Sequence, residues 1–206
     1  MSKASTPWVI KFGGSLSGTE ALGKGIRALA PLRVIIVPGG GPFADAIRIS
    51  QMQLGFGDRV AHQLAIQAMG LYGQMLHGIE PRLHRATTIA HLRDMCERHQ
   101  ALLWLPDPDE ACLSSLEASW NVTSDTLAVH LALTLGVPQV LLMKSLDSKP
   151  GEESLQDASD QGIIDQALPE RIRGSTLKLW RTGPQGFEGL AKGLENPVSW
   201  FTRMVY

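Results

Sequence analysis

Residues 32–42, LRVIIVPGGGP, form the stretch that decides the predicted fold. The first six residues are almost continuously apolar and rich in β-branched side chains, which is typical of a strand buried on both faces of a parallel sheet. Pro38 ends the strand, and a triple glycine follows it directly. Apolar side chains then return at helical spacing over residues 43–52. The stretch therefore predicts a strand, a glycine-rich turn and a helix in succession.

The rest of the chain repeats this alternation. Short apolar runs predict further strands at residues 8–12, 101–105, 139–144 and 177–180. Helical spacing predicts further helices at residues 19–30, 59–77, 88–98, 126–135 and 163–172. Residues 147–162 are polar and rich in Gly, Ser and Asp, so we expect an exposed loop there. Strands that alternate with helices predict an α/β sandwich with a largely parallel sheet.

Length and composition are those of an ordinary globular chain. Its 206 residues fit one domain, predicted to span 1–206, and neither an internal repeat nor a linker divides them. A net charge of -1 gives no reason to expect a nucleic-acid or membrane partner. No apolar run approaches the roughly 18 residues of a membrane span, and no signal-peptide core precedes residue 8. Cys96 and Cys112 lack metal-ligand spacing, so we expect free thiols and a cytoplasmic protein.

Three predicted strand ends carry unusual residues. Ligands of open α/β sheets collect at the carboxyl ends of the strands. Glycine turns at these ends expose backbone amides that suit anionic oxygens, and a Cβ would hold a phosphate away. The candidates for a phosphate site are Lys11, Gly13, Gly14 and Ser15 after the first strand, Gly39, Gly40 and Gly41 after the second, and Lys144 with Asp147 after a later one.

Each of these candidates also has a purely structural interpretation. Lys11 lies in an apolar strand, and a lysine is rarely buried unless it is paired. The alternative is an edge lysine whose ammonium group reaches solvent. Lys144 could simply mark the point where a strand leaves the core. The triple glycine could only relieve strain in a tight turn, although three glycines exceed what a turn requires.

Two further candidates come from predicted helices. Asp125 follows Thr123 and Ser124 at a helix start, where a carboxylate is expected to cap the helix. A carboxylate at this place could also hold two lysines in a charged and oriented form. His62 lies on a partly apolar helix, where a lone histidine is more often structural than functional. No group of residues has metal-ligand spacing, and we predict no protein metal site.

Residues 39–44 also fit the relaxed dinucleotide pattern G-x-G-x-x-A. The match is weak, because Pro42 is an unusual occupant and no acidic residue ends a second strand about twenty residues later. The glycines are not followed by Gly-Lys-Ser/Thr, which excludes a P-loop. A dinucleotide-dependent oxidoreductase using nicotinamide therefore stays as one alternative.

Four motifs in chain order resemble the amino-acid kinase superfamily. They are KFGGS at 11–15, VPGGG at 37–41, TSDTLA at 123–128 and KSLD at 144–147. Together they are specific, although each motif alone is moderate. Residues 41–45 and 61–73 are most similar to a compact branch, the kinases of methanofuran biosynthesis, which phosphorylate aminomethyl-furanmethanol phosphate.

The resemblance implies a three-layer αβα sandwich with a mainly parallel central sheet. It implies an anionic small-molecule acceptor in the N-terminal half, about residues 1–115, and ATP with its Mg²⁺ in the C-terminal half, about residues 116–206. The γ-phosphoryl group of ATP would pass to a phosphate monoester or, as an alternative, to a carboxylate. A homo-oligomer is expected by analogy with related kinases.

The resemblance also implies roles for the candidate residues. The transferred phosphoryl group would lie on Lys11, Gly13, Gly14 and Ser15. Asp125 would orient the lysines, while Lys144 and Asp147 would border the nucleotide. The acceptor would contact Gly39, Gly40 and Gly41 together with Arg59 and His62.

Four features depart from the family pattern. Ser148 follows Asp147 where the family often has glycine, and residues 162–165 lack a lysine that is common there. The closing Gly-Thr pair is missing, and residues 196–206 are unfamiliar. A nucleotide-binding relative without catalysis is therefore another alternative.

Overall fold

The computed structural model of the protein describes residues 7–96, 98 and 100–206. Its strands are β1 (Trp8–Phe12), β2 (Val34–Pro38), β3 (His84–Ala86), β4 (Ala101–Trp104), β5 (Gln139–Met143), β6 (Gly151–Ser154), β7 (Lys178–Thr182) and β8 (Thr202–Val205). Its α-helices are α1 (Glu20–Leu29), α2 (Gly41–Leu54), α3 (Asp58–Ile79), α4 (Ile89–Met95), α5 (Ser124–Leu135), α6 (Leu155–Asp160), α7 (Leu168–Ile172) and α8 (Leu190–Glu195). Short 3₁₀ helices are η1 (Gly14–Leu16), η2 (Ala111–Ser115), η3 (Pro184–Gly189) and η4 (Pro197–Ser199).

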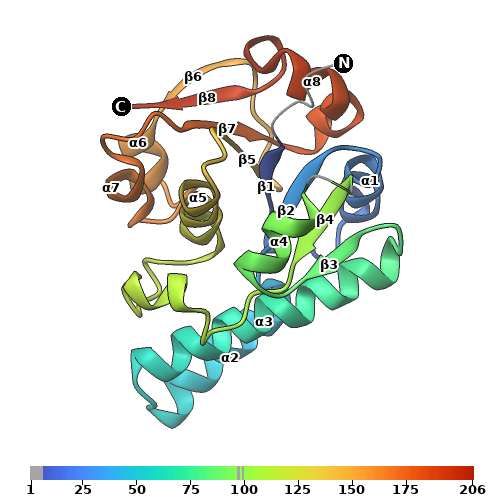
Figure 1. Cartoon of the computed structure of the whole chain (residues 1–206). Coiled ribbons are helices and arrows are strands. Elements are labelled where there is room, and N and C mark those ends of the chain that lie inside the picture. Colours follow the sequence, from blue (N-terminus) through green and yellow to red (C-terminus); the bar gives the residue numbers. More distant parts are fainter. Residues whose placement is uncertain (1–6, 97, 99) are drawn as a thin grey trace.

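The described strands form one eight-stranded sheet with helices on both of its faces (Figure 1). The strand order is β3-β4-β2-β1-β5-β7-β8-β6. Neighbouring strands run parallel, except for the antiparallel pair β7 and β8. This arrangement confirms the predicted αβα sandwich. The single sheet runs through both predicted halves of the chain, while the division into acceptor and nucleotide halves stays a prediction.

Strand β1 shows how the two outer layers are built. Alternate side chains of a strand point to opposite faces of the sheet. Val9 belongs to the core cluster that includes side chains of α5, whereas Ile10 belongs to the cluster with side chains of α1 and α8. Lys11 pairs in register with Val37 of β2 and Leu142 of β5, so it lies in the middle of the sheet. Because alternate residues share a face, the Lys11 side chain lies on the same face of the sheet as Val9, which is the face that α5 covers.

Helices α2 and α3 form a hairpin that extends beyond the sheet at the lower edge of Figure 1. Helix α2 contains no buried residue, and it exposes large apolar side chains such as Met52 and Leu54. Helix α3 instead buries one face, including Tyr72 and Leu76, against the sheet. The hairpin is therefore held to the body mainly through α3.

The prediction of an exposed loop over residues 147–162 is wrong. That segment contains strand β6 and helix α6, whose N-terminus is capped by Ser154 accepting from Asp157 N at 3.2 Å. Strand β6 has the sequence GEES and lies at the sheet edge, so it needs no apolar pattern. The unfamiliar tail forms β8, which lies between β7 and β6. The short edge strand β3 was also not predicted, because two of its three residues are exposed.

Within the described residues, no helix combines the length and apolarity needed to cross a membrane.

Candidate active site

The carboxyl ends of β2, β1 and β5 lie side by side, because these three strands are parallel neighbours in the sheet. The glycine turns after β1 and β2 are in direct backbone contact. Gly39 N donates to Phe12 O at 2.8 Å, and a Cβ on Gly14 would lie 2.5 Å from Gly41 N. Such a distance leaves no room for a side chain, so glycine is required for the two turns to meet. Gly41 also adopts a φ of 53°, which favours glycine.

The amides of these turns divide into two groups. Gly13 N donates to Met143 O at 2.9 Å, and Gly39 N is likewise bonded within the sheet, so both amides are already used. Gly14 and Gly41 begin η1 and α2, where the first amides have no partner within the helix. Gly14, Ser15, Gly40 and Gly41 also line a cavity. The amides available to an anion therefore come from this second group, while ligand roles for Gly13 and Gly39 stay predictions.

A carboxylate and two ammonium groups lie directly behind the turns. Lys11 Nζ is 2.9 Å from Asp125 Oδ1, and Lys144 Nζ donates to Asp125 Oδ2. The three side chains are 7%, 2% and 14% exposed for Lys11, Asp125 and Lys144. A Cβ on Gly13 would lie 3.7 Å from Lys11 Nζ, which places this ammonium group beside the first glycine turn. The structure thus brings together the two lysines and the aspartate that the sequence predicted.

The charges of this cluster are set by burial and by mutual attraction. Burial opposes ionisation of Asp125, but the two lysines outweigh it and lower the pKa of Asp125 to about 2. Burial also opposes the charge on Lys11, yet the attraction of Asp125 raises its pKa. For Lys144, burial together with the charge of Lys11 outweighs Asp125 and lowers its pKa. Asp125 is therefore an anion at neutral pH that holds two cations toward the glycine turns.

The expected capping role of Asp125 is wrong, because its carboxylate oxygens pair with Lys11 and Lys144 and not with the backbone amides of α5. The first turn of α5 is capped from outside by Asp165, which accepts hydrogen bonds from the backbone and hydroxyl groups of Thr123 and Thr126. Sequence reasoning missed this carboxylate because it lies about forty residues further along the chain, in the region that lacks the expected family lysine.

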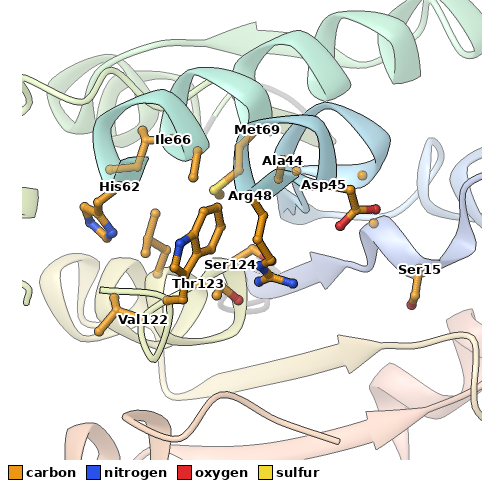
Figure 2. Close-up of a pocket in the computed structure, with 16 residues that line it drawn as sticks. Ser15, Ala44, Asp45, Arg48, His62, Ile66, Met69, Val122, Thr123 and Ser124 are labelled. Carbon is orange, nitrogen blue, oxygen red and sulfur yellow. The ribbon is translucent and has the colours of Figure 1, made fainter. Parts of the chain in front are cut away.

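A cavity of about 270 Å³ opens in front of the two glycine turns. Figure 2 shows Ser15 and Asp45 toward one end, His62 and Ile66 toward the other, and Arg48 between them. The wall beside Arg48 is Trp120, whose ring centroid lies 4.4 Å from the guanidinium carbon. Residues from both predicted halves of the chain line this space.

Polar groups in the cavity wall differ in how they are held. Trp120 Nε1 donates to Gln51 Oε1 at 2.6 Å, which ties the loop before α5 to helix α2. Burial lowers the pKa of His62, so the imidazole is neutral at pH 7, and its Nε2 has no partner among the described residues. Asp45 is exposed, and its carboxylate likewise has no hydrogen bond or ion pair within the described part of the chain. These residues were not predicted, apart from His62.

Two predicted site residues, Arg59 and Asp147, belong neither to the lining of this cavity nor to the glycine turns and the lysine cluster behind them. Arg59 lines a neighbouring cavity of about 440 Å³, which shares His62 and Ile66 with the first. The Asp147 carboxylate accepts from Gln185 N at 3.0 Å, so it ties the loop after β5 to η3. Their roles in binding acceptor and nucleotide stay predictions.

Over residues 7–96, 98 and 100–206, no three His, Cys, Asp or Glu side chains gather in a way that could hold a metal ion.

Comparison with known proteins defines the class. Residues 6–148 match the Amino acid kinase family, and the chain belongs to this family. It is 29% identical over 210 residues to the [5-(aminomethyl)furan-3-yl]methyl phosphate kinase of Methanocaldococcus jannaschii, with 96% of this chain and 97% of that protein covered. The predicted family, the predicted similarity to its compact branch and the predicted class of small-molecule kinase are confirmed. The same result removes the dinucleotide-dependent oxidoreductase alternative.

Solved structures show the same fold. A uridylate kinase from Archaeoglobus fulgidus superposes with a TM-score of 0.72 at 18% identity, covering 97% of this chain and all of that chain (100%). A UMP kinase from Ureaplasma parvum gives a TM-score of 0.70 at 13% identity, covering 98% of this chain and 99% of that one. At such identities the likeness concerns the fold alone.

Proposed function

We propose that this kinase transfers the γ-phosphoryl group of Mg-ATP to a phosphate monoester, of the kind named for the Methanocaldococcus relative. The observation that carries the proposal is the buried cluster of Lys11, Asp125 and Lys144 beside two touching glycine turns and an open cavity. In such a reaction the acceptor phosphate and the phosphates of ATP, which are all anionic, must come together. This part of the described structure offers them two enclosed lysines and backbone amides without a helical partner.

The proposed reaction is an in-line displacement. An oxygen of the acceptor phosphate forms a bond to the γ-phosphorus, while the bond from that phosphorus to the β–γ bridging oxygen breaks and ADP leaves with the electron pair. The acceptor oxygen is already anionic near neutral pH, so no general base is required. Positioning and positive charge then supply most of the rate. This requirement agrees with a site built from lysines and amides.

Each residue has a role that follows from its place. Lys11 would contact the transferred group together with the amides of Gly14 and Ser15. Lys144, at the end of β5, would contact the nucleotide phosphates, and Asp125 would hold both ammonium groups in place. Mg²⁺ bound to ATP would neutralise part of the phosphate charge.

The cavity wall supports an acceptor with a planar ring. The guanidinium of Arg48 lies over the indole ring of Trp120, so the wall presents an aromatic ring and a cation side by side. The guanidinium suits an anionic group, and the unpaired Asp45 gives the same helix a negative charge that suits an amine. An acceptor that carries a ring, an amine and a phosphate matches these three features.

The test is an assay with Mg-ATP and four acceptors: [5-(aminomethyl)furan-3-yl]methyl phosphate, UMP, N-acetylglutamate and aspartate. We expect ADP and a new diphosphate, seen by phosphorus NMR, with the furan phosphate. Conversion of a carboxylate alone would make the protein a carboxylate kinase. ATP binding without turnover of any acceptor would favour the non-catalytic alternative.

The remaining expectations are part of the same proposal. The supply of ATP favours a cytoplasmic reaction. A homo-oligomer, expected by analogy with related kinases, is tested by light scattering of the purified protein.

A further inference from the structure

Asp165 makes an unusually complete set of hydrogen bonds at the start of α5. Its Oδ2 accepts from Thr123 N at 2.8 Å, from Thr126 N at 2.9 Å and from Thr126 Oγ1 at 2.9 Å. Its Oδ1 accepts from Thr123 Oγ1 at 2.6 Å. The two threonines flank Ser124 and Asp125, so these bonds fix the backbone turn from which the Asp125 side chain projects.

Three further charges influence Asp165, each from a different element of the fold. Asp125 comes from α5, Lys11 from β1 and Lys144 from the end of β5. Asp165 makes its hydrogen bonds to Thr123 and Thr126 on either side of Asp125, so its charge lies near the carboxylate that pairs with both lysines. Burial and the charge of Asp125 raise the pKa of Asp165, whereas its hydrogen bonds and Lys11 act in the opposite direction.

We propose that Asp165 is a positioning residue of the active site, which fixes the first turn of α5 through Thr123 and Thr126 and adds a second negative charge near the lysine cluster. This role rests on the proposed kinase activity, but it concerns a residue that the proposed reaction does not use. It also assigns a purpose to the region where the family lysine is missing: the segment supports the lysines that are present.

A simple helix cap is the alternative to a positioning residue. A cap affects only the stability of the fold, whereas a negative charge near the lysines also affects their pKa values. Burial and Lys11 lower the pKa of Lys144, and the negative charge of Asp165 opposes that decrease. Removal of this charge therefore lowers the pKa of Lys144 further, and activity should be lost at a lower pH on the alkaline side.

The experiment compares Asp165→Asn with Ser154→Ala, which removes the side-chain cap of α6. For Asp165→Asn we expect kcat to fall about tenfold to a hundredfold, the range found when an outer partner of a site residue is removed. We also expect the alkaline limb of its pH–rate profile to move to lower pH. Ser154→Ala should change neither quantity. Asp165→Asn with lower thermal stability but unchanged kcat and pH profile would overturn the proposal.

A second measurement does not depend on turnover. Carbon-13 NMR of protein labelled at the lysine ε-carbons follows the titration of each ammonium group, and Lys144→Met identifies the Lys144 signal. The Lys144 midpoint should be lower in Asp165→Asn than in the unchanged protein, and an unchanged midpoint would overturn the role. If the unchanged protein phosphorylates no acceptor, the proposed function fails while this titration still decides the role of Asp165.

Thr126→Val covers the case in which Asp165→Asn does not fold. It removes the hydroxyl donor to Asp165 but keeps the carboxylate charge. We expect a smaller loss of kcat and no movement of the alkaline limb. A movement of that limb as large as expected for Asp165→Asn would contradict the assignment of the effect to charge.

Discussion

The two sides of the cavity are built in opposite ways. Behind the glycine turns, Lys11, Asp125 and Lys144 are at most 14% exposed, and each is paired within the sheet layer. On the other side, helix α2 has no buried residue, and its Asp45 has no partner among the described residues. In the proposed mechanism, the groups that act on the transferred phosphate are thus fixed by packing, while the groups assigned to the acceptor would gain a partner only when it binds.

This difference has a physical basis. A charge that is enclosed in low dielectric interacts strongly with a phosphate and needs no reorganisation when it does so. A charge on an exposed helix is screened by water until a ligand covers it. Substitutions behind the turns should therefore reduce kcat, and substitutions on α2 should mainly raise KM.

The largest expected effect is that of Lys11→Met. It removes one of the two enclosed cations, and we expect kcat to fall by about 10³-fold or more, as when a charged group is removed from other phosphoryl-transfer sites. Circular dichroism should show an intact fold. Lys24→Met on the exposed surface of α1 is the matched control. Near-normal turnover of Lys11→Met would exclude the proposed mechanism.

The next largest effect is expected for Gly14→Ala. The added Cβ would lie 2.5 Å from Gly41 N, so the two turns must separate. Displacing groups at a reaction centre by about 1 Å can lower kcat by about 10²-fold, and we expect a loss of this order for Gly14→Ala. Gly78→Ala in α3 adds the same atom where nothing lies within 4 Å, and it should leave kcat unchanged. Equal kcat values for the two variants would show that contact between the turns is unimportant.

A smaller effect, on KM, is expected from the exposed side. Arg48→Met removes the guanidinium that stacks on Trp120. A lost charge-assisted hydrogen bond to the acceptor should raise its KM by about tenfold to a hundredfold, with kcat within about twofold. The control is Arg203→Met on β8, an arginine far along the sheet. A fall in kcat at unchanged KM would contradict this role and would mean that Arg48 acts on the transferred phosphoryl group.

The smallest effect concerns the middle of α5, where His130 tests whether this helix is held in place beyond its first turn. His130 Nε2 lies 2.6 Å from Cys112 O, and Nδ1 contacts an Arg171 nitrogen, so the ring is neutral with Nδ1 accepting. Burial and the charge of Arg171 lower its pKa below 6.5. The unfolded chain then binds the proton first as pH falls.

The free energy of unfolding should therefore decrease below pH 6.5, by at most about 1.4 kcal/mol per pH unit, until the folded-state pKa is passed. Urea unfolding at several pH values measures this slope. His130→Gln should remove that contribution. The control, His91→Gln, at an exposed position of α4, should leave it unchanged. Identical slopes in the unchanged protein and His130→Gln would mean that His130 is not held as the structure indicates.

The centre of the sheet could be predicted from sequence because its physics is local. Strands β1, β2 and β5 are buried on both faces, so each appears as an apolar run, and the glycines that follow mark where backbone must approach backbone. Lys11 and Lys144 stood out because a charge in such a run requires a partner. Asp125, at a predicted helix start, was a possible partner for them, and the family resemblance assigned it that role.

The remaining features depend on contacts that sequence does not display. Strand β6 is half exposed and polar, so it resembles a loop. Asp165 and Trp120 reach the site from loops, and nothing in their neighbouring residues indicates where those loops pack. Arg59 lies one helical turn from His62, yet it faces the neighbouring cavity, because spacing predicts a helix but not which side of it meets a given pocket.

The place of β8 in the sheet also sets an order of assembly. Strand β6 pairs only with β8 in this sheet, and β8 is made more than forty residues later. The strands β3, β4, β2 and β1 can associate while the ribosome is still producing the rest of the chain. Glu152 and its neighbours must wait for Thr202–Val205 to emerge, so synthesis that stops early would leave an unpaired edge open to other chains.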